Sequence, residues 1–462
     1  MSDINLIIED IKKAEKGVRN KKIDPLLKER FLFYAKEIYS IGKNYEMIYY
    51  YFEPSKKNDR SFQNELEKYL ENKEKGLEYH IKAELPKLKG IDIKILEKKV
   101  DDLETIKKKA EKENKYIRNI IIDTASSFQA KINILIELKK ENKRKAFECA
   151  KKAYGDIDED LQKEALKYYK KRIAFLNERK KKGLATSIVK NSIKREKFDA
   201  EYIKKYFDLS LEKSELDKYG FKTVIDSSVT SIDVRYSSPG YSSPVIFIPK
   251  ERRAGKRKMF QLIAHEIGCH ALANMGNKEL GIDGLSIGRD WEIVHEGMAL
   301  VSEENMKRKI MGDSFPEFKL RLGVYYILAI YKAKELIEEN KQDDIENIYN
   351  YIFNLYQKEM LVTGYNKETS EIKAKESTKR VLVRIYRGLF PYYFSKDKTY
   401  FEGVFIAEKM KKNEVDIYPL ISKVDPKLIS DLIKIGFYKE SEILQKRARK
   451  IEKIAETMWD NL

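Results

Sequence analysis

Apolar residues recur at helical spacing, among charged ones, through most of the first 210 residues. The runs 93–103 and 130–138 place isoleucine and leucine three or four positions apart with polar residues between them, which is typical of amphipathic helices. The chain of 462 residues is 42% hydrophobic, which is enough to fill several cores and excludes wholesale disorder. We therefore expect a bundle of helices in the first part of the chain.

The pattern changes between residues 219 and 249, where short β-rich runs alternate with turns of Ser, Asp, Gly and Pro. These runs predict strands at 221–225, 231–236 and 245–248, which we expect to form a small antiparallel sheet. Helical spacing then predicts helices at about 257–275, 290–310, 316–339, 342–361 and 371–386. The expected fold class is mainly α with a small antiparallel β-sheet, an α+β arrangement.

The sequence offers no sign of a membrane or secreted protein. No apolar run approaches the roughly 18 residues that a membrane span requires, and the first ten residues carry acids where a secretory signal would carry bases. Cys149 and Cys269 lie far apart, so neither a disulfide framework nor a four-cysteine zinc site is expected. We expect a cytoplasmic protein with no membrane partner.

The formal net charge is +18, of which +13 falls within residues 1–190. Two basic clusters, at 170–182 and 250–258, could attract a polyanion such as nucleic acid or the acidic tail of a protein. We favour the simpler interpretation that these clusters reflect a chain rich throughout in Lys, Ile, Asn and Tyr. Because no nucleic-acid-binding module is recognisable, nucleic acid is not an expected partner, whereas an acidic tail stays a candidate.

Histidines are scarce and clustered in this chain. Of the four, three fall within 31 residues: His265, His270 and His295. The first two belong to His265-Glu266-Ile-Gly-Cys-His270, at the end of a run that predicts an amphipathic helix. A hydrolytic zinc site needs neutral imidazole nitrogens as ligands and a base beside the metal-bound water. We expect Zn²⁺ bound by His265 and His270, with Glu266 as the catalytic base.

The spacing of this H-E-x-x-x-H (HExxxH) motif is one residue longer than that of the familiar H-E-x-x-H motif. In an ideal helix the longer spacing separates the two imidazoles by roughly 140°, too far for one metal ion. A single π-type turn would restore their convergence, and Gly268 makes such a turn easier. The alternative is a pair of unrelated helical histidines.

A third metal ligand is expected from the helix predicted to begin near residue 290. Glu296 is the candidate, because the small residues Gly297 and Ala299 would let this helix approach the first one closely. Glu303 lies seven residues further on the same face and could hold a ligand histidine by its second ring nitrogen. His295 would point elsewhere, into the substrate cleft or as a capping or core residue. If His295 were the ligand instead, the site would contain three histidines.

Together with further motifs, these residues resemble the tyrosine carboxypeptidases related to the microtubule-associated enzymes that remove the last tyrosine from α-tubulin, and their prokaryotic relatives. The similar elements are His-Glu-Ile-Gly-x-His at 265–270, an EGLA-type motif at 296–299 with the later Glu303, Arg-x-x-Arg-Gly at 384–388, Phe-Ser-Lys-Asp-x-x-Tyr-Phe-x-Gly at 394–403 and a Tyr-Gly turn at 154–155. This chain departs from the family pattern at His295, where the family usually has Glu or Gln, at Met298 for Leu and at Ser395 for Thr.

The resemblance implies three regions and a set of site residues. The regions are a helical N-terminal region at 1–139, a zincin-like zinc metallopeptidase catalytic domain at 140–410 and a helical C-terminal region at 411–462 that packs on the catalytic domain. The implied zinc ligands are His265, His270 and Glu296, with Glu266 as the base. The resemblance alone implies a hydrolase that acts as a carboxypeptidase on a protein or peptide C-terminus, releasing tyrosine or another aromatic residue.

A carboxypeptidase needs a cation to hold the terminal carboxylate of its substrate, and arginine forms the bidentate pair that this recognition favours. Arg384 and Arg387 share one face of a predicted helix and are the candidates, with Lys396 next. The alternative is a structural ion pair of these arginines with Asp397. Tyr400 could donate to the oxyanion of the reaction, and Tyr386 is a second candidate for that role.

Two other kinds of function stay open. The same metal centre could serve a zinc endopeptidase or aminopeptidase, which peptides with free and amidated carboxyl termini would distinguish. The chain could also be a non-catalytic, basic helical binding protein in which zinc only clamps the fold. The intact Glu266 argues against that second alternative, because structural zinc needs no base.

Overall fold

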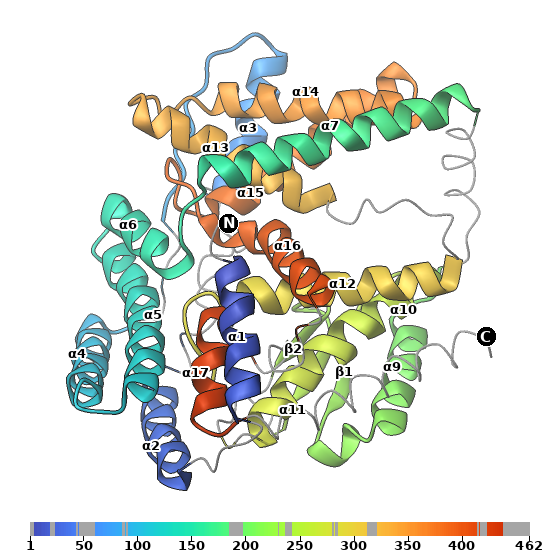
Figure 1. Cartoon of the computed structure of the whole chain (residues 1–462). Helices are drawn as coiled ribbons and strands as arrows, with labels where there is room; N and C mark the ends of the chain where they lie inside the picture. The colour runs from blue at the N-terminus through green and yellow to red at the C-terminus, as the bar shows by residue number, and fades with distance from the viewer. Residues whose placement is uncertain are drawn as a thin grey trace.

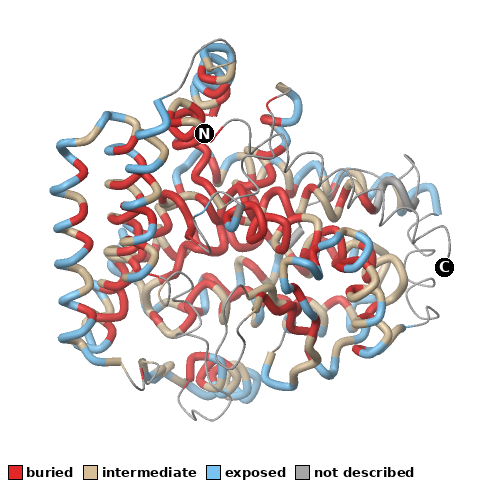
Figure 2. Tube along the Cα trace, turned by 90° about the horizontal axis from the view of Figure 1, so that it is seen from below, coloured by how far each residue is buried: buried red, intermediate tan, exposed pale blue. Residues whose placement is uncertain are grey.

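The computed structural model of the chain is mainly helical, with one three-stranded sheet. It describes residues 4–18, 24–42, 45, 61–85, 88, 91–183, 197–229, 231–235, 243–279, 281, 285–311, 321–413, 415 and 423–437. Buried residues concentrate in the middle of the molecule, while the outer helices expose one side (Figure 2). The mainly α, α+β class predicted from the sequence is confirmed. No helix within the described ranges is both long and apolar enough to cross a membrane.

The first part of the chain builds a helical layer around α5 (Lys115–Lys139), on the left of Figure 1. The neighbours of α5 in this layer are α2 (Pro25–Gly42), α4 (Ile93–Ala110) and α6 (Lys143–Tyr154). The helix begins where the Asn114 side chain accepts a hydrogen bond from the backbone N–H of Tyr116, as a good N-cap does. Because α5 is surrounded, its buried residues lie on more than one face.

A second layer of helices crosses the top of Figure 1. Its members are α3 (Phe62–Glu74), α7 (Glu159–Lys181), α13 (Arg321–Glu338), α14 (Ile345–Thr363) and α15 (Lys367–Tyr386). The buried carboxylate of Glu359 on α14 accepts hydrogen bonds from Tyr325 on α13, at 2.6 Å, and from Arg172 on α7, at 3.0 Å. A fully buried charge is tolerated here because both of its oxygens have donors.

The helices predicted after the sheet begin and end within four residues of the observed ones wherever those ends are described. They correspond to α10 (Lys256–His265) and its continuation to Glu279, α12 (Trp291–Met311), α13, α14 and α15. The predicted helix start at 316–320, the strand end at 236 and much of the predicted C-terminal helical region, including 438–462, lie outside the described residues. The part of that region that is described contains α17 (Ile429–Lys434), which packs against α1 (Ile4–Val18) and α5.

The small sheet is mixed, so the prediction of an antiparallel sheet was wrong in part. Its strand order is β1 (Lys222–Asp226), β3 (Val245–Pro249), β2 (Asp233–Arg235). β1 pairs with β3 in parallel, and β2 pairs with β3 in antiparallel. The prediction failed because the sequence pattern identifies the strands but not which strands lie side by side. The all-apolar β3, buried at all five positions, takes the centre.

Two helices that carry the family-like motifs cross at a pair of glycines. α12 meets α16 (Thr399–Lys412) at Gly297 and Gly403, and the two helices overlap near the centre of Figure 1. A Cβ atom built on Gly297 would collide with the backbone of Gly403, and one built on Gly403 would collide with the carbonyl oxygen of Ile293. Gly297 therefore allows close approach to α16, rather than the approach to α10 that the sequence predicted.

The start of α12 is tied to the C-terminal part of the chain by one buried carboxylate. Asp425 accepts hydrogen bonds from the backbone N–H of Asp290 at 2.8 Å and of Lys427 at 2.9 Å. Burial, together with the nearby charges of Asp290 and Asp123, raises the pKa of Asp425 to about 7. The junction that positions α12 therefore contains an acid that keeps its proton up to neutral pH.

Replacing Gly297 or Gly403 with alanine should destabilise the protein by about 2–3 kcal/mol, because the added methyl group forces the two helix backbones apart. Gly17→Ala is the matched control, since Gly17 lies in α1 with no atom within 4 Å of the position of its Cβ. That control should be neutral or slightly stabilising. Denaturant unfolding measures all three variants, and equal stability of Gly297→Ala and the wild type would contradict the tight crossing.

Asp425→Asn should flatten part of the pH dependence of stability. The folded state keeps this proton up to about pH 7, whereas an unfolded aspartic acid loses it near 3.8. The wild-type free energy of unfolding therefore falls as pH rises through that window, by at most about 4 kcal/mol from this group. The variant lacks this titration, so urea unfolding at several pH values should show a smaller fall. Parallel pH profiles would contradict the raised pKa.

Candidate metal centre

The two histidines of the HExxxH motif lie at the two ends of a distorted helical turn. Between α10 and α11 (Leu272–Glu279), residues Glu266–Ala271 form a π-helical turn, η3. A π turn accommodates one residue more than an α-helical turn, so the π-type turn predicted from the spacing is confirmed. The ring centroids of His265 and His270 lie 4.8 Å apart, with the ring planes at 75°. The two imidazoles therefore converge instead of facing opposite sides of a helix.

His265, Glu266 and His270 offer ligand atoms that all lie within 4.8 Å of one another. The site is shielded from solvent, since Glu266 is 6% exposed and the His265 side chain 13%. The two imidazoles suit zinc, although other divalent transition metals share this preference, and the carboxylate of Glu266 beside them is available as a base. The residues present therefore fit the metal ion that the motif predicts.

Helix α12 contacts His265 through the predicted residue Glu303. Oε1 of Glu303 lies 2.9 Å from Nδ1 of His265. The other carboxylate oxygen of Glu303 accepts a hydrogen bond from Lys258 at 2.9 Å. Burial would raise the pKa of Glu303, but His265 and Lys258 outweigh it and lower the pKa to about 2. For His265 the effects are reversed. Burial would lower its pKa, but the negative charges of Glu266 and Glu303 raise that pKa to about 9. A cation that binds His265 must therefore displace a proton.

Glu266 is a buried acid whose protonation responds to its neighbours. Burial raises its pKa to about 8, and the charges of Asp233, Glu296 and Glu303 act in the same direction, while His265 opposes them. A carboxyl group poised near neutral pH can both accept and return a proton. This is the behaviour that a catalytic base in a hydrolytic site needs.

Glu296 lies near this cluster but outside both groups of potential ligands that the described residues form. Its negative charge raises the pKa of His265, and burial raises its own pKa, against the opposing charge of Lys396. The predicted role of Glu296 as third ligand therefore stays a prediction. The second group of potential ligands is Cys269, His270 and His295, and the sequence reasoning had given Cys269 no role.

His295 does not point away from the metal centre, contrary to the orientation predicted for it. Its Nε2 lies 2.6 Å from Nδ1 of His270, with the ring centroids 4.4 Å apart. Burial lowers the pKa of His295 well below its ordinary value, and the charges of Lys423 and His265 lower it further. Two neutral imidazoles therefore face each other beside the π turn. In the sequence, the signal for this contact was that His295 lies within the same 31 residues as His265 and His270.

The arginine pair of the sequence analysis divides into two environments. Arg387 is buried and gives Asp397 two hydrogen bonds, at 2.9 and 3.0 Å. Arg384 donates to Asp397 at 3.0 Å and to the Tyr400 hydroxyl at 2.9 Å, and 39% of its side chain is exposed. Burial would raise the pKa of Asp397, but the two guanidinium groups lower it to about 2. Both arginines thus form the ion pair with Asp397 that was the alternative, and they differ in that Arg384 still reaches solvent.

Lys396 and Tyr386, two further candidates, are buried. Lys396 is 3% exposed, and its Nζ lies 3.4 Å from Glu292, whose other oxygen lies 3.5 Å from the buried Lys131. Tyr386 is fully buried and packs its ring on Phe62 and Phe390. Tyr386 is therefore a core residue, which does not fit the oxyanion role predicted for it. The positive charge of Lys396 acts on the metal centre. It opposes the rise that burial causes in the pKa of Glu296, and it contributes to the lowered pKa of His270.

The family-like Tyr-Gly turn contacts the motif at 394–403, although the two lie some 240 residues apart. The Ser395 hydroxyl donates to the carbonyl oxygen of Gly155 at 2.6 Å, and the Tyr393 hydroxyl donates to Asp156 at 2.6 Å. Tyr154 packs edge-on against Phe394. These contacts fix the 3₁₀ turn η4 (Ser395–Lys398), which carries Lys396 and Asp397.

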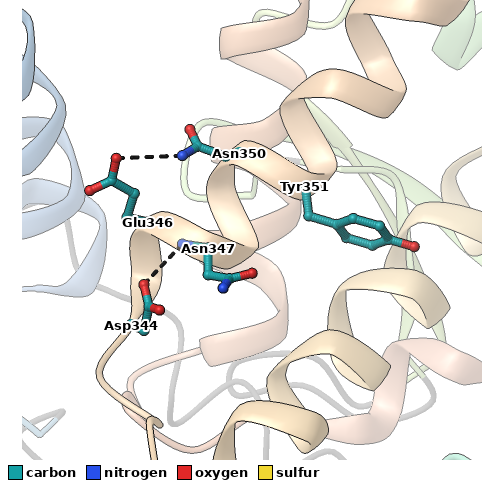
Figure 3. A pocket seen from close by; sticks show the side chains of 5 residues that line it. All are labelled: Asp344, Glu346, Asn347, Asn350 and Tyr351. Carbon is teal, nitrogen blue, oxygen red and sulfur yellow. Dashed lines mark hydrogen bonds between the residues drawn. The ribbon is translucent and has the colours of Figure 1, made fainter.

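A surface hollow of about 560 Å³ lies away from the metal centre, on α14. Its lining residues are Asp344, Glu346, Asn347, Asn350 and Tyr351 (Figure 3). Asp344 caps α14 by accepting from the N–H of Asn347, and Glu346 accepts from Asn350 and from Lys73 on α3. Figure 3 shows the Tyr351 ring turned away from the other four side chains. These polar groups stabilise the helix and its contact with α3, so we assign the hollow no ligand.

Comparisons with known proteins add little to this geometry. No family model matches the chain, and no curated protein matches its sequence. The solved structure of a "putative lipoprotein" from Colwellia psychrerythraea is similar at a TM-score of 0.36 and 13% identity, over 79% of this chain and 69% of that one. A likeness at that level carries no argument, so the resemblance to tyrosine carboxypeptidases stays a prediction.

Asp397→Asn should destabilise the protein by about 3–5 kcal/mol, because it leaves the buried Arg387 guanidinium without its anion. Arg384→Gln should cost no more than about 1 kcal/mol, since the Arg384 side chain is 39% exposed and water can replace its partners. Denaturant unfolding at pH 7 compares the two variants with the wild type. Losses of equal size would show that Arg387 is not the dominant partner of Asp397.

Proposed function

We propose that the chain is a zinc-dependent metallopeptidase that hydrolyses the C-terminal peptide bond of a protein or peptide. The observation that carries this proposal is the π turn, which brings His265, His270 and the buried Glu266 together within 4.8 Å. The contact between Glu303 and Nδ1 of His265 supports it, because metal-ligating histidines usually have their second nitrogen held in this way.

Each residue of the centre has a chemical task in this proposal. Zinc, when bound by the imidazoles of His265 and His270, would supply a Lewis acid for a water molecule and for the scissile carbonyl group. Glu266 takes a proton from the attacking water and gives it to the amine nitrogen as the peptide bond breaks. Its burial suits this task, because the carboxylate is not stabilised by bulk water. We retain Glu296 as the proposed third ligand.

The carboxypeptidase mode rests on Arg384 and on the family resemblance. The partly exposed guanidinium of Arg384 is oriented by Asp397 and Tyr400, which leaves it able to pair with the terminal carboxylate of a substrate. A preference for C-terminal tyrosine or another aromatic residue comes from the resemblance alone. Within the basic segment 250–258, Lys258 is held by Glu303, while the exposed Lys250 is available to attract an acidic tail.

The alternatives from the sequence analysis stay candidates. An endopeptidase or aminopeptidase would use the same histidines and Glu266 without needing Arg384. A non-catalytic binding protein with structural zinc would need no buried carboxyl group with a raised pKa beside the histidines, which is why we place it last. We also propose a cytoplasmic location, since Cys149 and Cys269 are both free thiols.

Glu266→Gln should lower peptide hydrolysis by roughly 10²–10⁴-fold while zinc binding is retained, because the variant loses the base but keeps both imidazoles. Glu251→Gln is the matched control, since Glu251 is exposed just before α10. Zinc content by elemental analysis and cleavage of peptides by mass spectrometry provide the two readouts. Loss of zinc in Glu266→Gln, or full activity without Glu266, would reject the assigned role.

Peptides that differ only at the carboxyl terminus test the mode of action. A carboxypeptidase should cleave the free acid and spare the C-terminal amide, because the amide cannot pair with Arg384. A series ending in Tyr, Phe, Ala and Glu tests the aromatic preference. Equal cleavage of free and amidated peptides would favour the endopeptidase or aminopeptidase alternative.

A further inference from the structure

Helix α12 contacts both histidines of the HExxxH motif at the same ring position. Glu303 lies 2.9 Å from Nδ1 of His265, and Nε2 of His295 lies 2.6 Å from Nδ1 of His270. His295 and Glu303 stand eight residues apart on α12, a little over two helical turns. In each case the Nε2 atom of the motif histidine is left for another partner. Helix α12 therefore contacts both motif imidazoles at their Nδ1 atoms.

We propose that His295 is a positioning residue, which fixes the ring and the tautomer of His270 so that Nε2 of His270 is the atom that binds the metal ion. This inference rests on the proposed function, because it assigns a role to His295 within the same metal centre. It replaces the predicted substrate contact of His295 by a contact with a ligand. The two motif histidines then have different orienting groups, a carboxylate for His265 and a neutral imidazole for His270.

The placement of protons follows from the contact between the two rings. A neutral imidazole that ligates through Nε2 carries its hydrogen on Nδ1, so His270 donates to Nε2 of His295. His295 must then be neutral and carry its own hydrogen on Nδ1. Among the described residues, that Nδ1 atom is buried and has no hydrogen-bond partner. A buried donor without a partner costs free energy, so the hydrogen bond that orients this ring is the one made by Nε2.

The second group of potential ligands, Cys269 with His270 and His295, fits a metal ion less well. Two nitrogens that bind one tetrahedral zinc at ~2.05 Å lie about 3.3 Å apart, whereas these two lie 2.6 Å apart, a hydrogen-bond distance. The Cys269 thiol is buried and lies 3.5 Å from the backbone carbonyl oxygen of His295, to which it donates. The geometry is that of a hydrogen-bonded pair of rings beside a protonated thiol.

The zinc affinity of the 462-residue chain tests the positioning role through three variants. His295→Leu removes the acceptor and should weaken zinc binding by about 10–100-fold, as loss of an orienting partner does. His295→Gln keeps a side-chain acceptor and should recover most of the affinity. Cys269→Ser is the matched control and should bind zinc as the wild type does. Competition with a chromophoric chelator measures the affinities, and thermal unfolding of the metal-free proteins checks that each variant folds.

Ring-nitrogen NMR of the wild type gives a readout that a purely structural role would not move. The chain has four histidines, so the spectrum of the ¹⁵N-histidine-labelled protein is simple, and the 83% exposed His80 serves as reference. On zinc addition, Nε2 of His270 should change as a metal-bound nitrogen while its Nδ1 keeps a proton. Metal binding through Nδ1 of His270, or zinc affinity of His295→Leu equal to wild type, would overturn the proposal. The same holds if His295→Gln loses as much affinity as His295→Leu.

Two further variants separate this proposal from the proposed function. If His265→Ala and His270→Ala lose zinc but His295→Leu does not, the metal centre stands and only the positioning role fails. If zinc binding survives both alanine variants, the proposed hydrolytic centre itself fails. If Cys269→Ser and His295→Leu lose zinc while His265→Ala keeps it, the ion belongs to the cysteine-containing group and the positioning role is wrong.

Discussion

The candidate metal centre depends on one additional residue in a helical turn. Five positions separate His265 from His270, and a regular α-helix would point their rings to different sides. The π turn η3 absorbs the extra residue and brings the ring centroids to 4.8 Å. π turns are rare because their backbone geometry is less favourable than that of an α-helix, and they recur at functional sites. The packing of α12 beside this turn then supplies the groups that hold each ring.

The position of α12 is set by backbone contacts and by buried charge. The crossing at Gly297 and Gly403 lets α12 and α16 approach without side chains between them. Asp425 fixes the start of α12 through the backbone N–H of Asp290. In the first turn of α12, Glu292 lies between the buried amines of Lys131 and Lys396. Each of these charges is expensive to bury alone, and each is compensated by a partner from a distant part of the chain.

The metal centre has an excess of acidic groups, which favours the binding of a cation. The negative charges of Glu296 and Glu303 raise the pKa of Glu266. Together with Glu266, these two carboxylates also raise the pKa of His265. Mutual repulsion of buried carboxylates is relieved by a proton or by a cation. A divalent ion would take over the role that protons have in the metal-free centre, which gives metal binding a release of protons as its signature.

Much of this site could be predicted from the sequence, but its contacts could not. Scarce histidines, a carboxylate beside the first and Gly268 were enough to predict the π turn, and the seven-residue spacing from Glu296 pointed to Glu303. The mixed sheet was missed because periodicity does not tell which strands are neighbours. The sequence left Arg384 and Arg387 equivalent, and only tertiary burial separated a solvent-reaching guanidinium from a buried ion pair.

The sequence by itself determined the helical elements and the spacing of the motif, because both follow from local periodicity and from the backbone geometry of a single turn. Tertiary structure alone decided the partners of the reactive groups. The contact of His295 with His270, the pairing of Gly297 with Gly403 and the lysines around Glu292 join residues that are distant in sequence. The physical reason is that burial and orientation of a side chain depend on which helices pack together, and no local pattern encodes that choice.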